Sequence, residues 1–561
     1  MGRIRLHKEE AMSRQKEACG ITDTDVAAYL EEVVLNRKLG KKTVSLMMCV
    51  ILGVALAGFG VMGQTLRIAS PYTIETLDPF NFTGDGDFYV ISQVYETLIN
   101  LEGDNVIPRL AESWENPDDV TWVFHLREMY WQDGNEVFAE GEAPMVTAHD
   151  FVYTLDYLLN PDNNLRRTAR LEPYIASYEA LDDLTLKIVT VEPSAFFLNT
   201  IETVCVVSQQ IMEALGDQFA DSPIGCGAYE FVENQAGHRV VLRANEDFFI
   251  DPAVDEVIFS IIPEHMTMLL ALEAGDIDIA LQIPSGEVER VLAEDKVTVH
   301  KNNVGWYRYM GFNFENPLFE ELAVRDAISK AIDMQTIVDL IYPVPGLAEV
   351  SWGPIPLGIA GFTEGWEKHW TYDPAAATAQ LKDAGWVDTD GDGLLDKDGT
   401  PFSFVLQPPS HDKARVKLAV LISTQLSAIG IEAKVQEKDW ATHLDDIRSG
   451  NVEAFIMGGG STPTGLLYMF HTVDASGGAH NTRYNNPELD ALLDEARRTV
   501  DLEKRLVLWR QAAEIVILDR VQIPAYYIFQ QSATAKNVVD FFPPNPWVSL
   551  CNVYRNVGFE E

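Results

Sequence analysis

The strongest spacing of chemically active side chains lies in the segment Asp388–Gly399, DTDGDGLLDKDG. It places carboxylates at the first, third, fifth and ninth positions and a glycine at the sixth, an order typical of calcium-binding loops. The carboxylates are Asp388, Asp390, Asp392 and Asp396. The twelfth position is Gly399 and not the bidentate Glu of such loops, and no helix pair is evident around the segment. The segment therefore predicts either a structural calcium ion or an acidic turn before a strand at Phe402–Leu406.

No arrangement of nucleophiles, bases or phosphate-binding glycines predicts catalysis. The sequence contains no G-x-S-x-G, no H-E-x-x-H and no phosphate loop. The run Gly458–Gly460 lacks the Lys that follows the glycines of a phosphate loop. The 11 histidines are scattered, and His443 and His471 fit surface or core positions better than that of a base. We therefore expect no enzymatic activity.

Aromatic side chains that could pack against a ligand gather at the start of the segment Gly305–Ile341. They lie on a predicted strand, and they are Trp306, Tyr307 and Tyr309. Trp and Tyr favour a pleated, half-buried surface, and neighbouring side chains of a strand point to opposite faces. Aromatic rings pack flat on peptide side chains or sugar faces and keep a polar group for orientation. Each ring could equally belong to the core.

The elements that must position these residues alternate between strands and helices. Strands are expected over 65–70, 122–127, 185–191, 240–243, 257–262, 277–281, 402–406 and 431–437, and apolar residues alternate with period two in 122–127 and 431–437. Helical spacing follows several capping residues, which are Thr147 with Asp150, Asp333, Asp373 before Pro374, and Asn486 before Pro487. Gly385 ends the helix that Asp373 caps, and Gly430 ends a further helix over 414–429. The alternation implies α/β lobes with mixed sheets.

Size and charge narrow the class of protein. A chain of 561 residues exceeds a single ordinary core, so two or three domains are expected. The formal net charge is -43. Such a surface repels nucleic-acid phosphates and anionic lipid headgroups, so neither is an expected partner. It suits cationic or neutral ligands, or a salty medium.

The five cysteines do not form a metal-binding pattern. Cys19 and Cys49 lie in the N-terminal region, which leaves Cys205, Cys226 and Cys551. No CxxC pair or Cys/His cluster is present, so structural zinc is not expected. Three cysteines leave at least one unpaired within the chain. A disulfide between Cys205 and Cys226 could form in an oxidising compartment, but sequence alone does not establish it.

The N-terminal region has the pattern of a polar extension followed by an export signal. Residues 1–36 are polar and mixed in charge, and basic residues between 37 and 42 precede an apolar run from Thr43 to Gly63. A basic flank, an apolar core and small residues at its end predict a signal peptide over 37–63, cleaved near Gly63. The alternative is an uncleaved membrane anchor, because the run approaches the roughly 20 residues that span a bilayer. Cys49 lies inside the apolar run, so a lipoprotein anchor is not expected.

Seven short motifs in a fixed order identify a resemblance. They are LAESW (110–114), VFHLR (123–127), W-x-D-G (131–134), VTAHDFVYTL (146–155), PIGCGAYEF (223–231), AISKAID (327–333) and GPIP (353–356). Together they resemble the family 5, peptide-type, solute-binding proteins of ABC importers. Beyond Pro356 the resemblance rests on the order of helices and strands. It implies a two-lobe, type II periplasmic-binding-protein fold with an inserted domain, in which mixed sheets are flanked by helices.

The resemblance also implies how the lobes are divided along the chain. The first lobe would combine residues 65–97, 223–305 and 533–561. The inserted domain would cover 98–222, and the second lobe would cover 306–532. The chain would cross between the lobes near Gly305 and Ser532, and these crossings would act as the hinge.

By the same resemblance, aromatic residues of three further loops stand in or beside the cleft walls. They are Tyr72, Trp352 and Trp440. Peptide-binding members place an Asp after the strand at Phe455–Met457, where it meets the ammonium of the peptide. Here that loop reads GGGSTPTG, with Gly459 or Thr462 at the corresponding position and no acid. A buried ammonium without a partner is costly, so either Asp85 or Asp87 replaces the missing acid or the ligand is not a peptide with a free N-terminus.

The resemblance implies an extracytoplasmic binding protein that captures oligopeptides or dipeptides and delivers them to a separate membrane permease. Capture would occur by hinge closure. We expect a monomer without a cofactor, apart from the calcium discussed above. The alternatives are the same role for an oligosaccharide or other small solute, and a secreted hydrolase, which would need a nucleophile and base or a carboxylate pair.

Overall fold

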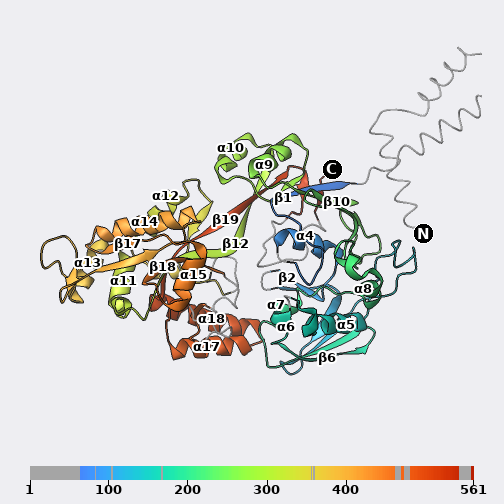
Figure 1. Cartoon of the computed structure of the whole chain (residues 1–561), viewed down its shortest axis with the longest axis horizontal. Coiled ribbons are helices and arrows are strands. Elements are labelled where there is room, and N and C mark those ends of the chain that lie inside the picture. Colours follow the sequence, from blue (N-terminus) through green and yellow to red (C-terminus); the bar gives the residue numbers. More distant parts are fainter. Residues whose placement is uncertain are drawn as a thin grey trace, which may run out of the picture. The chain divides into compact units, whose positions relative to one another are not determined.

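The computed structural model describes residues 64–82, 84–102, 105–165, 168–355, 357, 361–460, 469–472, 481–541 and 557–560. The chain divides into two compact units, Met1–Gln64 and Thr65–Glu561. The N-terminal extension and the signal segment predicted from the sequence lie outside the described residues, as does Cys551. All of the described helices and strands belong to the second unit (Figure 1).

A mixed sheet of eleven strands runs through the second unit. Their order along the sheet is β17, β16, β18, β12, β19, β11, β1, β10, β9 and β8, with β13 also paired to β19. The bounds are β1 Thr65–Ser70, β8 Tyr229–Gln235, β9 Arg239–Ala244, β10 Glu256–Ile261, β11 Ile279–Ala280, β12 Val297–Phe312, β13 Ala348–Val350, β16 Ser403–Gln407, β17 Glu432–Val435, β18 Ala454–Gly460 and β19 Gln522–Ala535. Parallel and antiparallel pairs both occur, so the mixed character predicted from the sequence is confirmed.

Two long antiparallel strands, β12 and β19, join the two ends of this sheet. The first part of β12 pairs with residues 529–535 of β19, and β19 also pairs there with β11. The second part of β12 pairs with residues 522–527 of β19 and with β18. The register between β12 and β19 shifts between Asn303 and Tyr307, the interval that holds Gly305. β12 begins at Val297, earlier than the strand expected at Gly305, because the alternating residues before it extend the same ladder.

A separate antiparallel sheet lies between β3 and β8 in the sequence. Its four strands are ordered β4, β5, β7 and β6. Their bounds are β4 Ala111–Glu115, β5 Thr121–Leu126, β6 Ile175–Asp182 and β7 Thr185–Thr190. The alternate residues Trp122, Phe124 and Leu126 are buried, as their spacing predicts. The capping box of Thr147 and Asp150 begins α5, Ala148–Leu159, and is confirmed.

The remaining elements are mostly helices. The α-helices are α4 Asp85–Val94, α6 Thr168–Leu171, α7 Phe197–Ile201, α8 Gln209–Leu215, α9 His265–Ala274, α10 Val288–Glu294, α11 Leu322–Lys330, α12 Met334–Ile341, α13 Pro374–Asp383, α14 Lys413–Ser427, α15 Trp440–Ser449, α17 Pro487–Arg498 and α18 Leu502–Leu518. Short 3-10 helices lie at 161–163, 216–220, 285–287, 317–319 and 366–369. Three two-stranded ladders pair β2 Ile99–Glu102 with β3 Asn105–Pro108, β14 Asp396–Lys397 with β15 Thr400–Pro401, and β20 Val538–Val539 with β21 Gly558–Phe559.

The helix boundaries expected from capping residues are present. The side chains of Asp333, Asp373 and Asn486 each accept a hydrogen bond from a backbone N–H in the first turn of the helix that follows. Gly385 and Gly430 follow α13 and α14 with positive φ angles of 91° and 82°. A glycine adopts this left-handed conformation without the steric penalty of a Cβ atom, which explains why both helices end there.

The apolar residues form several packed clusters. The largest joins α4 and α5 to β5, β7 and β8–β10, and a second packs α11–α14 against β12, β16 and β18. Cys205 and Cys226 are buried in the first cluster as thiols, and no disulfide joins them. The bridge considered from the sequence is therefore absent from the structure. Among the helices described, none combines the length and the apolar character needed to cross a membrane.

Candidate ligand-binding site

The carboxyl ends of three parallel strands meet at one edge of the large sheet. β16 pairs in parallel with β17 and with β18. β12 runs antiparallel to β18, so its residue Trp306, opposite Gly460, reaches the same edge. Ligands of open α/β sheets bind outside the carboxyl ends of the strands. The loops after Gln407 and Val435, together with the end of β18, are therefore the wall against which a ligand is expected.

Tyr307 and Tyr309 support this wall from within the protein. Both rings are buried and belong to a small apolar cluster with Phe455 and Tyr527. The Tyr307 hydroxyl accepts a hydrogen bond from Gln522, and the Tyr309 hydroxyl accepts one of 3.2 Å from Asn481 Nδ2. Alternation along the strand could not reveal this, because β12 is covered on both faces. We therefore assign these two rings to the core.

Gly459 keeps the backbone of β18 close to its neighbours. A Cβ atom at this position would lie 2.7 Å from Met469 Cε and 2.9 Å from Tyr307 Cε1. A side chain here would therefore have to displace the end of Met469 and press on the buried Tyr307 ring. Thr462 lies outside the described residues, as does the side chain of Trp306. Their predicted contacts with the ligand stay predictions.

Trp440 and Trp352 lie at different depths. Trp440 is the first residue of α15, its side chain is 40% exposed, and its ring centre lies 5.3 Å from that of His411. Trp352 is half-buried, and its carbonyl oxygen accepts a 2.8 Å hydrogen bond from Trp370 Nε1. A cavity of about 230 Å³ is lined by Trp352, Trp370 and Tyr372. Trp440 therefore has the ring that is open to a ligand at the sheet edge.

Tyr72, Asp85 and Asp87 lie near the first turn of α4 but differ in availability. The Tyr72 hydroxyl accepts a 2.6 Å hydrogen bond from Gln282 Nε2. Asp85 is half-buried, and burial raises the pKa of its carboxyl group. Asp87 is 1% exposed, and its Oδ1 accepts hydrogen bonds from the backbone N–H groups of residues 75 and 76. Asp87 thus fixes a loop, and Asp85 remains the acid that can meet a ligand.

Two arginines that the sequence patterns did not single out meet at the same sheet edge. Arg308 follows Tyr307 on β12, and Arg415 lies in the first turn of α14. A Cβ atom on Gly458 would lie 2.8 Å from Arg308 Nη1 and 3.0 Å from Arg415 Nη2. The absence of a side chain at Gly458 therefore makes room for both guanidinium groups. The only sequence signal was the cationic residue inside an aromatic strand.

His443 is a core residue and not a base for catalysis. It is fully buried in α15, next to Gln407, whose Nε2 lies 3.4 Å from His443 Nδ1. Burial, followed by the charge of Arg415, lowers the pKa of His443 to about 4. The imidazole is therefore neutral at pH 7, in agreement with the core position considered from the sequence.

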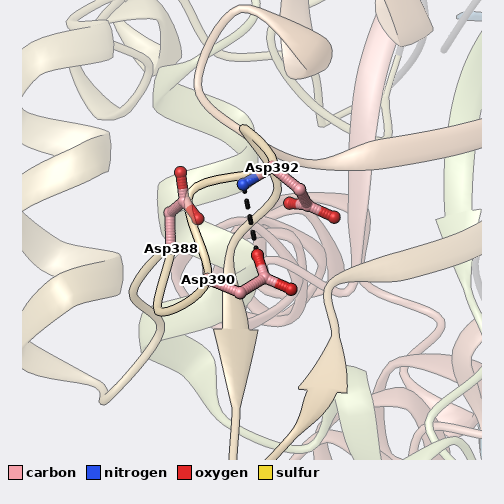
Figure 2. A group of neighbouring side chains, drawn as sticks. All are labelled: Asp388, Asp390 and Asp392. Carbon is pink, nitrogen blue, oxygen red and sulfur yellow. Dashed lines mark hydrogen bonds between the residues drawn. The ribbon is translucent and has the colours of Figure 1, made fainter.

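The acidic loop brings together three of the four predicted calcium ligands. Carboxylate oxygens of Asp388, Asp390 and Asp392 lie within 4.8 Å of one another on the exposed loop (Figure 2). Hydrogen bonds within the loop fix its conformation, such as the 3.2 Å bond from Asp392 N to Asp390 Oδ1. Asp396 instead accepts hydrogen bonds from Thr389. Calcium binding stays a prediction, which calorimetry with Ca²⁺ on the wild type and on D390N would check.

Comparison with known proteins places the chain among binding proteins. Residues 105–481 match the family model of the bacterial extracellular solute-binding proteins, family 5 Middle. The oligopeptide-binding protein AppA of Bacillus subtilis is 28% identical over 493 residues, which cover 84% of this chain and 88% of that protein. The dipeptide-binding protein of Escherichia coli K12 is 25% identical over 499 residues, covering 83% and 89%. The structure of HbpA2 from Haemophilus parasuis aligns with a TM-score of 0.77 at 22% identity, covering 89% of this chain and 100% of that one. The predicted fold is confirmed.

Proposed function

This chain belongs to the bacterial extracellular solute-binding proteins of family 5, and from that premise we propose that it captures peptides for an ABC importer. The observation that carries the proposal is the site at the carboxyl edge of the sheet, next to the two long strands, β12 and β19, that join its two ends. Similarity to an oligopeptide-binding protein along most of both chains supports the peptide as ligand. The protein acts by binding alone and hands its ligand to a separate permease without chemical change.

The two long strands supply the hinge of the proposed mechanism. The first lobe is composed of residues 65–97, 223–305 and 533–561, the inserted domain of 98–222, and the second lobe of 306–532. β12 and β19 are the segments shared by the two lobes, and the register shift between Asn303 and Tyr307 supports bending at that point. Ligand binding closes the lobes by bending these strands.

The proposed function also requires that the protein is exported from the cytoplasm. Residues 37–63 act as a signal peptide that is cleaved near Gly63, so that the protein works outside the cytoplasm as a monomer. The basic flank, the apolar run and the small residues at its end support this assignment. N-terminal sequencing of the extracytoplasmic protein tests it, because a sequence that begins at Met1 or Met12 contradicts cleavage.

Identification of the bound ligand tests the proposed function. The full chain is expressed in an exporting host, the extracytoplasmic protein is purified, and native mass spectrometry identifies what co-purifies. We expect peptides, and we expect small-angle scattering to show compaction when a peptide is added to the emptied protein.

A neutral oligosaccharide is the competing ligand, because the loop GGGSTPTG at residues 458–465 offers hydroxyl and backbone groups but no carboxylate. Calorimetry against an oligosaccharide pool decides between the two classes. Binding of sugars without binding of peptides would overturn the peptide assignment while leaving the family role in place.

A further inference from the structure

The cavity beside Trp352 lies on the flank of the large sheet, apart from the wall at the ends of β16–β18. Ile523 and Pro524 of β19 line it, and its volume is about 230 Å³. β13 leads into it, because Ser351 N donates a 3.0 Å hydrogen bond to Ala525 O just before Trp352. β13 pairs with the side of β19 that faces away from β12, whereas β18 lies beyond β12. Two long strands therefore separate this cavity from the proposed peptide site.

Three aromatic side chains line the cavity, and they are Trp352, Trp370 and Tyr372. Both tryptophans are half-buried, and Tyr372 is 52% exposed, so its ring is open to a group that enters from solvent. The hydrogen bond from Trp370 Nε1 to Trp352 O, 2.8 Å long, joins the two segments that carry the tryptophans. The faces of aromatic rings carry a negative potential and attract cations.

Trp370 already binds one cation of the chain in this way. The guanidinium carbon of Arg520 lies 4.5 Å from the centre of the Trp370 ring. Arg520 does not line the cavity, so the surface that Trp370 presents there is not covered by this guanidinium group.

Asp333 gives the cavity a negative charge that no cation of the chain balances. Its carboxylate accepts hydrogen bonds from Thr336 N at 3.1 Å and from Thr336 Oγ1 at 2.7 Å, and within the described part of the chain it forms no ion pair. The cations of the flanking segments, Lys330 and Arg520, are both paired with Asp326, at 2.6 and 3.0 Å. The residues that line the cavity include this one carboxylate and no cationic side chain.

We propose that the cavity binds a small organic cation of the alkylated ammonium class, at a site separate from that of the peptide. The three rings would contact the alkyl groups and attract the charge, and Asp333 would balance it. An alkylated ammonium has no N–H donors to satisfy, so a cavity lined largely by rings suits it better than the strongly hydrated ammonium of a lysine. The volume is below the roughly 300–1,000 Å³ of pockets for drug-sized ligands, which fits a head group of this kind. The site is additional to the proposed function and does not depend on it.

A comparison of choline with its uncharged analogue tests the site in the intact exported protein. In the analogue a tert-butyl group replaces the trimethylammonium group, so shape and apolar surface are kept and only the charge is lost. Calorimetry and tryptophan fluorescence follow both titrations. We expect choline to bind at least about tenfold more tightly than the analogue, because only the charged group gains from the rings and the carboxylate.

Two substitutions test the residues themselves. Asp333→Asn removes the charge and keeps the start of α12, since Asn caps a helix as well as Asp does. It should weaken choline at least about fivefold and leave the analogue unchanged. Tyr372→Leu should weaken choline at least about fivefold as well, whereas Tyr372→Phe, which keeps the ring, should retain the affinity.

Matched controls alter the same residue types elsewhere. Asp501 caps α18 as Asp333 caps α12, and Tyr130 is 51% exposed, yet neither lines the cavity. Asp501→Asn and Tyr130→Leu should therefore bind choline as the wild type does. Circular dichroism and melting curves of all variants show whether the fold is kept, and the ratio of choline to analogue affinity reports on the charge alone.

Occupancy of the peptide site separates the two sites. Choline affinity should change by less than about twofold when the protein is saturated with peptide. Loss of choline binding under these conditions would place choline in the peptide site and overturn the proposal. If no peptide binds, the peptide function fails, and the choline titrations still decide the fate of the cavity.

The remaining outcomes are equally decisive. Equal affinity for choline and the analogue would make the cavity a purely apolar one and overturn the cation site. Absence of choline binding would overturn it too, as would an affinity that Asp333→Asn and Tyr372→Leu both leave unchanged. None of these three results would affect the proposed capture of peptides.

Discussion

Glu202 is a buried carboxyl group whose ionisation opposes folding. Its side chain is 9% exposed, and Oε2 accepts a 3.0 Å hydrogen bond from Leu101 N. Burial raises the pKa of Glu202 to about 8, whereas in the unfolded chain the group titrates near 4.5. The stabilising contribution of the protonated group is therefore complete below about pH 4.5 and is lost as the pH rises through about 8.

Glu202→Gln should remove this part of the pH dependence. At pH 5 the free energy of unfolding should be close to that of the wild type, and at pH 8.5 the variant should be more stable by on the order of 3 kcal/mol. Denaturant unfolding at several pH values measures the difference. Glu289→Gln, at an exposed carboxylate of α10, is the control. A constant difference between Glu202→Gln and the wild type from pH 5 to 8.5 would contradict the shifted titration.

Side-chain roles were harder to predict than side-chain positions. Asp85 and Asp87 both lie near the start of α4 as expected, yet only the fold shows that Asp87 turns inward to hold a loop. Tyr307 and Tyr309 lie on the predicted strand, but the residues that bury their rings, such as Ile447 and Phe455, come from distant segments. Arg415 is 107 positions from Arg308 in the numbering of the chain, so their proximity depends on the pairing of β12 with β18 and on the placement of α14. No local pattern contains that information.

At the level of elements, the motif PIGCGAYEF passes closely by the end of α4. Gly227 N donates a 2.8 Å hydrogen bond to Val94 O, and Gly225 N donates one of 3.1 Å to Gln132 Oε1. A Cβ atom on Gly225 would overlap the carbonyl group of Val94. These contacts involve backbone atoms, which cannot move aside as a flexible side chain can. The two glycines are therefore required by packing and not by an unusual backbone conformation.

Gly225→Ala should destabilise the protein by about 2–4 kcal/mol, because an added methyl group must displace the end of α4. Urea unfolding and the melting temperature measure the loss. Gly286→Ala is the matched control, since a Cβ atom there meets no neighbour within 4 Å, and its effect should stay below about 0.5 kcal/mol. Similar melting curves for the two variants would contradict the packing argument.

Periodicity and capping residues predicted most elements to within a few positions. β1 has the predicted bounds, and Asp333, Asp373 and Asn486 begin the helices that they were expected to begin. The errors occur where pairing decides the length of a strand. β11 is limited to Ile279–Ala280 because β1 and β19 pair with it over only those two residues, and β12 extends back to Val297 because β19 continues beside it.

At the scale of the whole molecule, a set of contacts joins the segment around the start of α7 to α17 and α18. Glu192 Oε1 lies 2.6 Å from Arg497 Nη1, and Ala195 N donates a 2.9 Å hydrogen bond to Arg497 O. Phe196 is buried in the cluster that contains Trp509 of α18. The neighbouring Phe197 is buried in a different cluster with α4 and β5. Adjacent phenylalanines thus anchor one segment in two cores.

Phe196→Ala and Phe197→Ala should therefore affect different parts of the protein. Loss of a buried Phe costs about 3–5 kcal/mol, and the cost should fall on the contacts that each ring makes. Hydrogen exchange should increase in residues 502–518 for Phe196→Ala, and in β5 and α7 alone for Phe197→Ala. Equal exchange in α18 for the two variants would contradict the separation of the two cores.

The position of β19 near the end of the chain has a consequence for biosynthesis. β19 forms ladders with β11, β12 and β13, so each of these strands keeps an unpaired edge until residues 522–535 have left the ribosome. Contacts between distant parts of a chain form late, and a long chain with open strand edges passes through incomplete states. During synthesis the topology therefore leaves the large sheet incomplete until β19 is available to pair.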